Sequence, residues 1–374
     1  MEITKPEKFE NEVLNEINDI LDIEILKRNT TSEFTEIKKF CEMSFLERCF
    51  LNGIIRQSKP IKILELGVAA GGSSAIILNA IKDFDNAKLY SVDYNKKLYY
   101  DNSKDIGFII DEKFSHLKDK WKLYTGGTAA KFMEEIGSEI DLCLIDTMHV
   151  NPGEFLDFLI VLPYLKKNAI LILHDICLHQ VHRNAVTNCI LFSCLKGKKF
   201  IFNEGFYSKF CNGIAINSLI NKRQTLDKGF GNEFSNIGAV ILDKDIKDNI
   251  LDYIFLLTLP WEYLLSDIDI LQCHKLFLKN YGKEIAEIFL GIIFLNKELF
   301  IKNKNAEISN INNNVYNEIN SIKIKYDNLE KDLSDIINSY KNLINTMAWW
   351  IPVRKWRDNF RNKFFDKFIG GGEK

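Results

Sequence analysis

The sequence predicts an α/β fold, with a doubly wound, mostly parallel sheet and a helical C-terminal extension that includes a coiled-coil segment. Two observations predict it. Between residues 60 and 175, short apolar runs of strand type alternate with segments of helical length and pattern. Beyond residue 243, strand-type runs cease and apolar residues recur at helical spacing. Alternation of the first kind is typical of a Rossmann-like sheet with right-handed crossovers and helices on both faces.

Composition and charge set limits on the class of protein. A chain of 374 residues is longer than one hydrophobic core usually supports, so we expect one full-sized domain with additional elements. The net charge of -2 gives no general attraction to nucleic acid, and no nucleic-acid partner is expected. Eight scattered cysteines without a CxxC pair are typical of a reducing compartment. We therefore expect a cytoplasmic protein without a signal peptide or a membrane-spanning segment.

The predicted organisation follows the chain in order. The expected strands are 61–66, 88–92, 121–125, 140–145, 168–173, 199–203, 213–217 and 237–242. The expected parts are a helical N-terminal segment (1–57), a cofactor-binding domain with insertions on the substrate side (58–243), an α-helical region (244–304), a coiled-coil-like helix (305–346) and a basic amphipathic segment (347–374).

A glycine-rich turn follows the first predicted strand, in the segment ILELGVAAGGSSA, residues 63–75. The order of strand, turn and helix is one that places backbone N–H groups at a helix N-terminus. Gly67 suits the tight turn that leaves the strand, and Gly71 and Gly72 allow close approach of backbone to a ligand. A glycine turn alone is a weak signal for a cofactor.

Two carboxylates strengthen that signal. Asp93 ends the next strand, where an acid suits the two hydroxyls of a ribose. Glu65 stands two residues before the first glycine, so the pattern is ExGxxxGG and not the GxGxxG of dinucleotide folds. The pattern favours a cofactor that has an amino group and no phosphate, and it argues against NAD.

At this point the segment resembles motif I of class I S-adenosylmethionine-dependent methyltransferases, over roughly residues 40–220. The resemblance implies that the glycine turn holds the methionine end of the cofactor and that the acid after the second strand holds its ribose. Gly126, in YTGGTAAKF, is expected at the adenine pocket, and an ordinary loop explains it equally well. The expected cofactor-binding residues are Glu65, Gly67, Gly71, Gly72, Ser73, Asp93, Gly126 and Asp146.

Two later strands end in acid and imidazole groups. The run IDLCLI ends at Asp146, with His149 three residues on, and the run ILIL ends at His174 and Asp175. If these strands are neighbours in the sheet, about 4.8 Å apart, the four side chains converge at one edge. Clustered carboxylates repel one another unless a positive group lies between them, so a divalent cation is expected. A hydrogen-bonded polar cluster without metal is the alternative.

This constellation resembles metal-dependent O-methyltransferases that modify sugars, and the related cephalosporin hydroxylase group. The resemblance implies that Asp146, His174 and Asp175 bind the metal and that His149 is the general base. The first residue of the pair is often Glu in those families, whereas here it is His174. An imidazole ligand favours Mn²⁺ or Fe²⁺ over Mg²⁺, and the departure leaves open whether His174 is a ligand at all.

The expected function is transfer of a methyl group from S-adenosylmethionine to a hydroxyl of a sugar, either an NDP-sugar or a surface-polysaccharide unit. A metal ion lowers the pKa of that hydroxyl, and His149 accepts its proton. One alternative is methylation of a small catechol-like metabolite. Another is a non-haem iron oxygenase, in which the ExGxxxGG turn has no role. A scaffold without catalytic activity is a further alternative.

The C-terminal part predicts interactions with other surfaces. Apolar residues alternate three and four apart, as in the a/d positions of a coiled coil, at Ile319, Ile322, Tyr326, Leu329, Leu333, Ile336, Tyr340 and Leu343. Two interpretations stand: a coiled coil between copies in a homo-oligomer, or a helix lying on its own domain. Residues 349–368 combine basic residues with an aromatic stripe, the composition of a peripheral anchor at the inner membrane face. Docking on a partner subunit is the alternative.

Overall fold

The computed structural model describes residues 12–30, 34–43, 45–180, 182–201, 236–349 and 354–368. The chain divides into two compact units, Met1–Phe300 and Ile301–Lys374. The first unit contains the sheet and its covering helices, and the second contains most of one long helix and the helix that follows it.

A seven-stranded sheet forms the centre of the first unit, in the order β10-β11-β9-β8-β3-β4-β7. β9, β8, β3, β4 and β7 run parallel, whereas β11 pairs antiparallel with both of its neighbours. The order reverses between β3 and β8, the kind of switch point at which doubly wound sheets bind ligands. The strands are β3 (Lys62–Leu66), β4 (Lys88–Asp93), β7 (Trp121–Thr125), β8 (Ile140–Ile145), β9 (Leu165–His174), β10 (Gly197–Ile201) and β11 (Ile237–Leu242).

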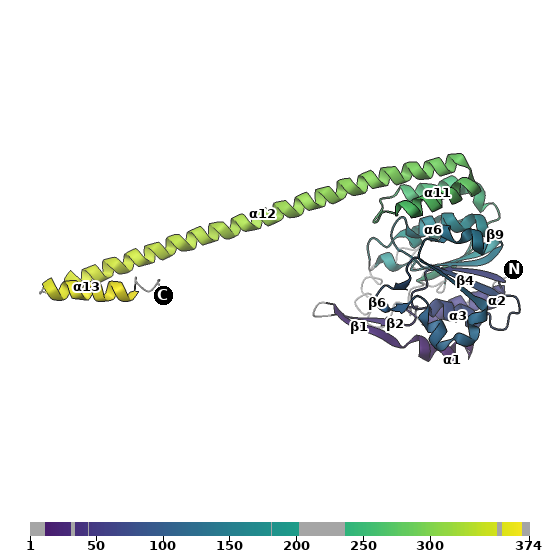
Figure 1. The fold of residues 1–374 in the computed structure, drawn as a ribbon, viewed down its shortest axis with the longest axis horizontal. Coiled ribbons are helices and arrows are strands. Elements are labelled where there is room, and N and C mark those ends of the chain that lie inside the picture. The colour runs from purple at the N-terminus through teal and green to yellow at the C-terminus, as the bar shows by residue number, and fades with distance from the viewer. Residues whose placement is uncertain are drawn as a thin grey trace, which may run out of the picture. The chain divides into compact units, whose positions relative to one another are not determined.

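Helices cover both faces of this sheet (Figure 1). Successive residues of a buried strand face opposite sides, so Leu64 belongs to one core and Ile63 to the other. The core on the Ile63 side includes residues of α1 (Glu12–Leu21), α2 (Phe45–Ser58), α3 (Gly72–Ala80) and α4 (Phe108–Lys113). The core on the Leu64 side includes residues of α5 (Met133–Ile136), α6 (Gly153–Val161), α7 (Thr187–Cys194), α10 (Ile250–Ile254), α11 (Asp267–Tyr281) and the start of α12 (Lys283–Trp349). The predicted doubly wound, mostly parallel sheet with a helical C-terminal extension is confirmed, and the coiled-coil segment stays a prediction.

The amino ends of the central strands are fastened by a polar network. The Lys62 ammonium group donates to the carbonyl oxygens of Ile136, Gly137 and Ser138 at 2.5, 3.0 and 2.7 Å. Asp141 Oδ2 accepts from the backbone N–H of Lys62 at 2.9 Å, and its Oδ1 accepts from the Lys166 ammonium group at 2.7 Å. These bonds join the amino ends of β3, β8 and β9, which lie opposite to the carboxyl ends of the same strands.

The N-terminal prediction was wrong in part. Residues 1–57 were expected to be helical, but a hairpin of β1 (Glu24–Thr30) and β2 (Phe34–Lys39) lies between α1 and α2. The two strands pair antiparallel up to Thr30 opposite Phe34. The sequence NTTS begins at the last two residues of β1, and residues of these types favour turns over helix interiors. The prediction extended the helical spacing of the residues before and after the hairpin across the hairpin itself, which does not have that spacing.

The other predicted strands agree with the sheet, with small shifts. The predictions confirmed within two residues are 61–66, 88–92, 121–125, 140–145, 199–203 and 237–242, and that for 168–173 lies within the longer β9. The prediction for 213–217 lies outside the described residues. A short hairpin of β5 (Lys97–Leu98) and β6 (Asp101–Asp105) was not predicted.

A single helix, α12, continues through the predicted boundary between residues 304 and 305. Its first turns pack in the core of the first unit through Ile285, Phe289 and Ile292. α13 (Arg354–Phe368) follows it in the second unit. Among the described helices, none has the length and hydropathy needed to cross a bilayer.

Candidate active site

The glycine turn after β3 packs directly against the end of β8. Gly67 has φ +86°, and a Cβ atom there would lie 1.7 Å from the backbone oxygen of Asp146. The Asp146 N–H donates to the Leu66 carbonyl at 2.9 Å, which closes this contact. Only glycine fits such a backbone approach. The glycine turn therefore packs directly against the backbone of Asp146, the first acid of the predicted metal site.

Asp93 fixes the shape of the same turn. Its Oδ2 accepts from the backbone N–H groups of Val68 and Ala69 at 3.0 and 3.1 Å. Ala69 has a left-handed backbone with φ +48°, which the bonds to Asp93 help to hold. Oδ1 accepts from the Asn95 N–H at 2.9 Å. Asp93 thus lies at the carboxyl end of β4 beside the turn, where the ribose acid was predicted.

Glu65 lies beneath the turn and is fully buried. Its Oε2 accepts from the hydroxyls of Ser74 and Ser91, each at 2.6 Å, whereas Oε1 has no hydrogen-bond partner among the described residues. Burial raises the pKa of this carboxyl group to about 7, against the hydrogen bonds from neighbouring serine hydroxyls. An unpartnered buried carboxylate oxygen can accept a proton or a donor such as an ammonium group.

The other predicted glycines have neighbours within the protein. A Cβ atom on Gly72 would lie 2.5 Å from both the Phe40 carbonyl oxygen and Cys41 Cβ, so this glycine makes room for the chain after β2. Sequence reasoning had assigned it to ligand approach and did not predict this contact. The Gly126 N–H donates to the Asp93 carbonyl at 3.1 Å, which places Gly126 at the same sheet edge.

The predicted acid and imidazole groups converge, because β8 and β9 are neighbours with Ile145 opposite Leu173. His149 Nε2 lies 3.0 Å from Asp175 Oδ2, and His174 Nδ1 lies 3.3 Å from Asp146 Oδ1. One ligand atom each from Asp146, His149 and Asp175 can be chosen so that all lie within 4.8 Å of one another. Among the described residues this trio is the group able to surround one ion.

His174 is the most enclosed of the four. It is 6% exposed, and its Nε2 lies 3.6 Å from Glu47 Oε1 on α2. Its Nδ1 also lies 3.5 Å from Asp175 Oδ2. The imidazole therefore lies among three carboxylates and is not a member of the trio that could surround an ion. Its predicted role as a metal ligand stays a prediction.

The electrostatics of this cluster favour positive charge. Burial opposes protonation of His149, but the hydrogen bond to Glu154 and the charges of Asp175 and Asp146 raise its pKa to about 9. Burial likewise opposes the charge on His174, yet Asp146, Asp175 and Glu47 hold its pKa well above the ordinary value. A divalent cation would offset the same carboxylates. The residues therefore fit a metal ion.

Glu154 was not predicted from the sequence. Its Oε1 lies 3.0 Å from His149 Nδ1, and its side chain is fully buried. The Thr187 hydroxyl donates to Oε2, and Asn188 Nδ2 donates to Oε1 at 3.3 Å. A signal existed: Glu154 and Asp157 are the two carboxylates in the otherwise apolar helix GEFLDFLIV.

Asn236, also missed, holds the turn that carries Asp175. Asp175 has φ +58°, and Asn236 Nδ2 donates to its Oδ1 at 2.5 Å. Asn236 Oδ1 accepts from the Cys177 N–H at 2.9 Å. No sequence pattern indicates this pairing, because it joins residues 61 positions apart.

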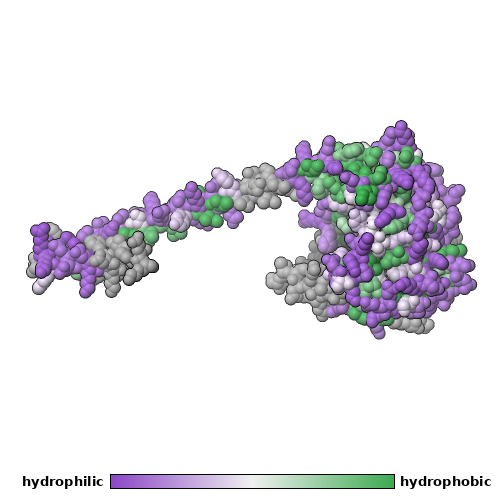
Figure 2. Space-filling model, viewed as in Figure 1, coloured by the Kyte–Doolittle hydropathy of each residue, from purple (hydrophilic) through white to green (hydrophobic). Residues whose placement is uncertain are grey.

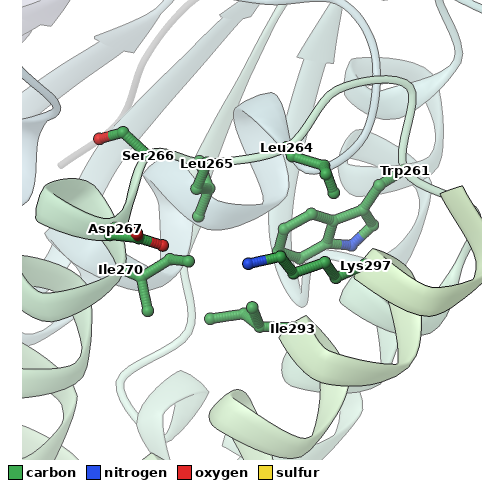
Figure 3. A pocket seen from close by; sticks show the side chains of 8 residues that line it. All are labelled: Trp261, Leu264, Leu265, Ser266, Asp267, Ile270, Ile293 and Lys297. Carbon is green, nitrogen blue, oxygen red and sulfur yellow. The ribbon is translucent and has the colours of Figure 1, made fainter. Parts of the chain in front are cut away.

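A pocket of about 240 Å³ is lined by the segment before α11, the first turn of α11 and helix α12 (Figure 3). Trp261, Leu264 and Ile293 line it, with Lys297 at one side. This volume is below the roughly 300–1,000 Å³ of small-molecule sites. No residue of the glycine turn or of the acid and imidazole cluster lines it, so it is separate from the candidate active site.

Metal affinity is expected to depend on pH. His149 is protonated below about pH 9 in the metal-free protein, and a cation bound beside it must displace that positive charge. We therefore expect Mn²⁺ affinity to rise by up to about tenfold per pH unit below that pKa and then to level off. Calorimetric titration across this range measures it. A flat profile in the wild type, or the same slope in His149→Gln, would contradict the expectation.

Comparison with known proteins agrees with the fold. Residues 64–176 match a family model described as a methyltransferase domain, and the match runs from β3 through Asp175. Over residues 64–176 the chain therefore resembles a methyltransferase domain, on a sheet with the predicted doubly wound strand order. The predicted class of enzyme is confirmed. A search among curated proteins gave no match.

Three solved structures illustrate the similarity. A methyltransferase from Podospora anserina bound to S-adenosylhomocysteine is 17% identical over 54% of this chain and 80% of that chain, with a TM-score of 0.34. An O-methyltransferase from Bacillus cereus is 12% identical over 53% and 82%, with a TM-score of 0.35. The O-methyltransferase TomG from Streptomyces achromogenes is 11% identical over 54% and 81%, with a TM-score of 0.33.

Proposed function

We propose that this chain transfers a methyl group from S-adenosylmethionine to a hydroxyl group of a sugar, either an NDP-sugar or a surface-polysaccharide unit, with the aid of Mg²⁺, Mn²⁺ or Fe²⁺. The observation that carries the proposal is the acid and imidazole cluster at the ends of β8 and β9, packed against the glycine turn through Gly67 and Asp146. The sugar rests on the resemblance of the DxxH and His-Asp pattern to sugar O-methyltransferases.

The cofactor roles follow the switch point of the sheet. Asp93 is proposed to accept from the ribose, since the three backbone donors it holds leave part of its acceptor capacity free. The turn from Gly67 to Ser73 is proposed to hold the methionine end, and the Oε1 atom of Glu65 offers an acceptor beneath it. Gly126 is proposed for the adenine side because it lies beside the Asp93 backbone.

Asp146 and Asp175 are the proposed metal ligands, and His149 is the proposed base. A bound divalent cation would lower the pKa of a nearby substrate hydroxyl. Glu154 accepts from the Nδ1–H of His149, which selects the tautomer whose Nε2 is free to take a proton. That Nε2 atom lies 3.0 Å from Asp175 Oδ2, so a hydroxyl held beside Asp175 is within its reach. The deprotonated oxygen would then attack the methyl group in line, the bond from that carbon to the sulfonium sulfur would break, and S-adenosylhomocysteine would leave.

His149→Ala is expected to lower turnover by about 100-fold or more while leaving the affinity for S-adenosylmethionine nearly unchanged. Its affinity for Mn²⁺ at neutral pH should not fall, because the variant lacks the positive charge that a cation must displace. Calorimetry and single-turnover assays measure the three quantities. His116→Ala, at an exposed histidine on the surface, is the matched control and should change none of them. A carboxylate on the second ring nitrogen also occurs in metal-bound histidines, so loss of Mn²⁺ binding would reassign His149 as a ligand.

The substrate class is tested by mass spectrometry of NDP-sugars incubated with enzyme, S-adenosylmethionine and each metal ion. Gain of one methyl group by a sugar supports the proposal. Methylation of a catechol and of no sugar would replace the sugar by a catechol-like metabolite. Failure of the wild type to bind S-adenosylmethionine in calorimetry would contradict the function as a whole.

The second unit supports two further parts of the proposal. Arg354, Lys355 and Arg357 begin α13, and Trp356 between them is 66% exposed. Because basic and aromatic side chains alternate here, residues 349–368 are proposed to make peripheral contact with the cytoplasmic face of the inner membrane. A homo-oligomer is proposed as well, because apolar residues recur three and four apart along α12, as in a coiled coil.

A further inference from the structure

Helix α12 carries a row of large apolar side chains that stay open to solvent. In Figure 2, hydrophobic patches interrupt the hydrophilic surface along this helix. An extended apolar patch of this kind marks an interaction surface. We call it the apolar seam, and it consists of Ile319, Ile322, Tyr326, Leu329, Leu333, Ile336, Tyr340, Leu343 and Met347, with exposed fractions from 53% to 69%.

Packing within the second unit buries neighbours of the seam but leaves the seam residues themselves open to solvent. Ile344 and Ala348 are 6% and 0% exposed, whereas the adjacent Leu343 and Met347 are each 54% exposed. The seam residues alternate three and four apart along their whole length, a period of 3.5. A repeat of 3.5 suits a second helix with the same repeat, because supercoiling keeps both seams in register.

Charged residues beside the seam favour a second copy in parallel orientation. With Ile319 at position a, Glu318, Lys325 and Asp332 occupy g, and Lys323 and Glu330 occupy e, with the apolar Ile337 at the next e position. In a parallel pair in register, each g residue faces the e residue of the next heptad on the other chain. Glu318 then faces Lys323 of the second copy, and Lys325 faces Glu330. Both pairs join opposite charges.

An antiparallel pair lacks this complementarity. In that orientation e positions face e positions and g positions face g positions. When the two seams overlap fully, residues 318–332, which hold the charged e and g positions, lie opposite residues 333–347 of the second copy. There the e positions are Ile337 and Ile344, and the g positions are Ser339 and Thr346. No charge would meet an opposite charge. We infer that residues 318–347 form a two-stranded, parallel, in-register coiled coil with a second copy of this chain.

The interface is tested on the full chain by sedimentation equilibrium. Ile322→Lys, at a d position, places a charged side chain from each of the two helices in the apolar interface. It is expected to raise the dimer dissociation constant at least about tenfold. Ile324→Lys is the matched control, because Ile324 is 62% exposed and lies at position f, away from the seam. It is expected to leave the constant within about twofold. Affinity for S-adenosylmethionine reports that both variants keep the catalytic domain folded.

Orientation is tested by charge reversal. Lys325→Glu places like charges opposite each other and is expected to weaken the dimer by roughly fivefold. Adding Glu330→Lys in the same chain restores opposite pairs and is expected to recover most of that loss. A wild type that stays monomeric at micromolar concentration would overturn the inference. Equal effects of Ile322→Lys and Ile324→Lys, a failure of the second reversal to rescue, or three or more chains per particle would also overturn it.

Discussion

Asp175→Asn is expected to lower both Mn²⁺ affinity and turnover by more than about 100-fold, since changes to groups outside the ligand shell already cost about 10- to 100-fold. The substitution removes the negative charge and keeps the shape of the side chain. Asparagine tolerates the left-handed backbone that Asp175 adopts at φ +58°. Asn168 has the same φ of +58° within β9, so such a position accepts asparagine in this fold.

Calorimetry with Mn²⁺ and a turnover assay measure the two effects, and the affinity for S-adenosylmethionine serves as the internal reference. Asp111→Asn, at an exposed acid on α4, is the control and should leave all three quantities unchanged. If Asp175→Asn bound Mn²⁺ as the wild type does, Asp175 would not be a ligand and the proposed site would need another acid.

Gly67→Ala is expected to destabilise the first unit by about 4 kcal/mol or more, at the upper end for single substitutions. The added Cβ atom would overlap the Asp146 backbone oxygen at 1.7 Å, and φ +86° strains any side chain. Because the turn must move, we also expect the affinity for S-adenosylmethionine to fall by at least about tenfold. Denaturant unfolding and calorimetry measure the two changes.

Gly291→Ala is the matched control for that experiment. Gly291 lies within α12, and a Cβ atom there would meet no other atom within 4 Å. Alanine at a helix interior position stabilises by roughly 0.5–1 kcal/mol relative to glycine. The two alanine substitutions should therefore change the unfolding free energy in opposite directions. Similar values for both variants would contradict the close packing of the turn against β8.

The central sheet was predictable because its strands are short apolar runs with turn residues between them. The ends of β8 and β9 could be placed for the same reason: Asp146 and Asp175 are the points at which apolar runs stop. Once those strands are neighbours, convergence of their end residues follows from the geometry of a parallel sheet. This part of the site depends on local sequence and a general topological rule.

The remainder depends on contacts between distant segments. Glu154 reaches His149 only because the chain turns back after β8, and Asn236 reaches Asp175 from the position just before β11. Residue 72 must be glycine because the Phe40 carbonyl oxygen lies close to it, and the unpredicted hairpin sets the position of Phe40. Such pairings leave no periodic signal, so spacing alone could not indicate them. The roles of the converging residues toward metal and cofactor remain predictions.

The two ends of the central strands have separate tasks. At the amino ends, Lys62 and Asp141 join three strands through hydrogen bonds that involve none of the residues proposed for chemistry. The anchoring of the sheet is thus divided from the strand ends that are proposed for the chemistry. Residues at the carboxyl tips of β8 and β9 can therefore be exchanged without loss of the hydrogen bonds that hold the amino ends of these strands.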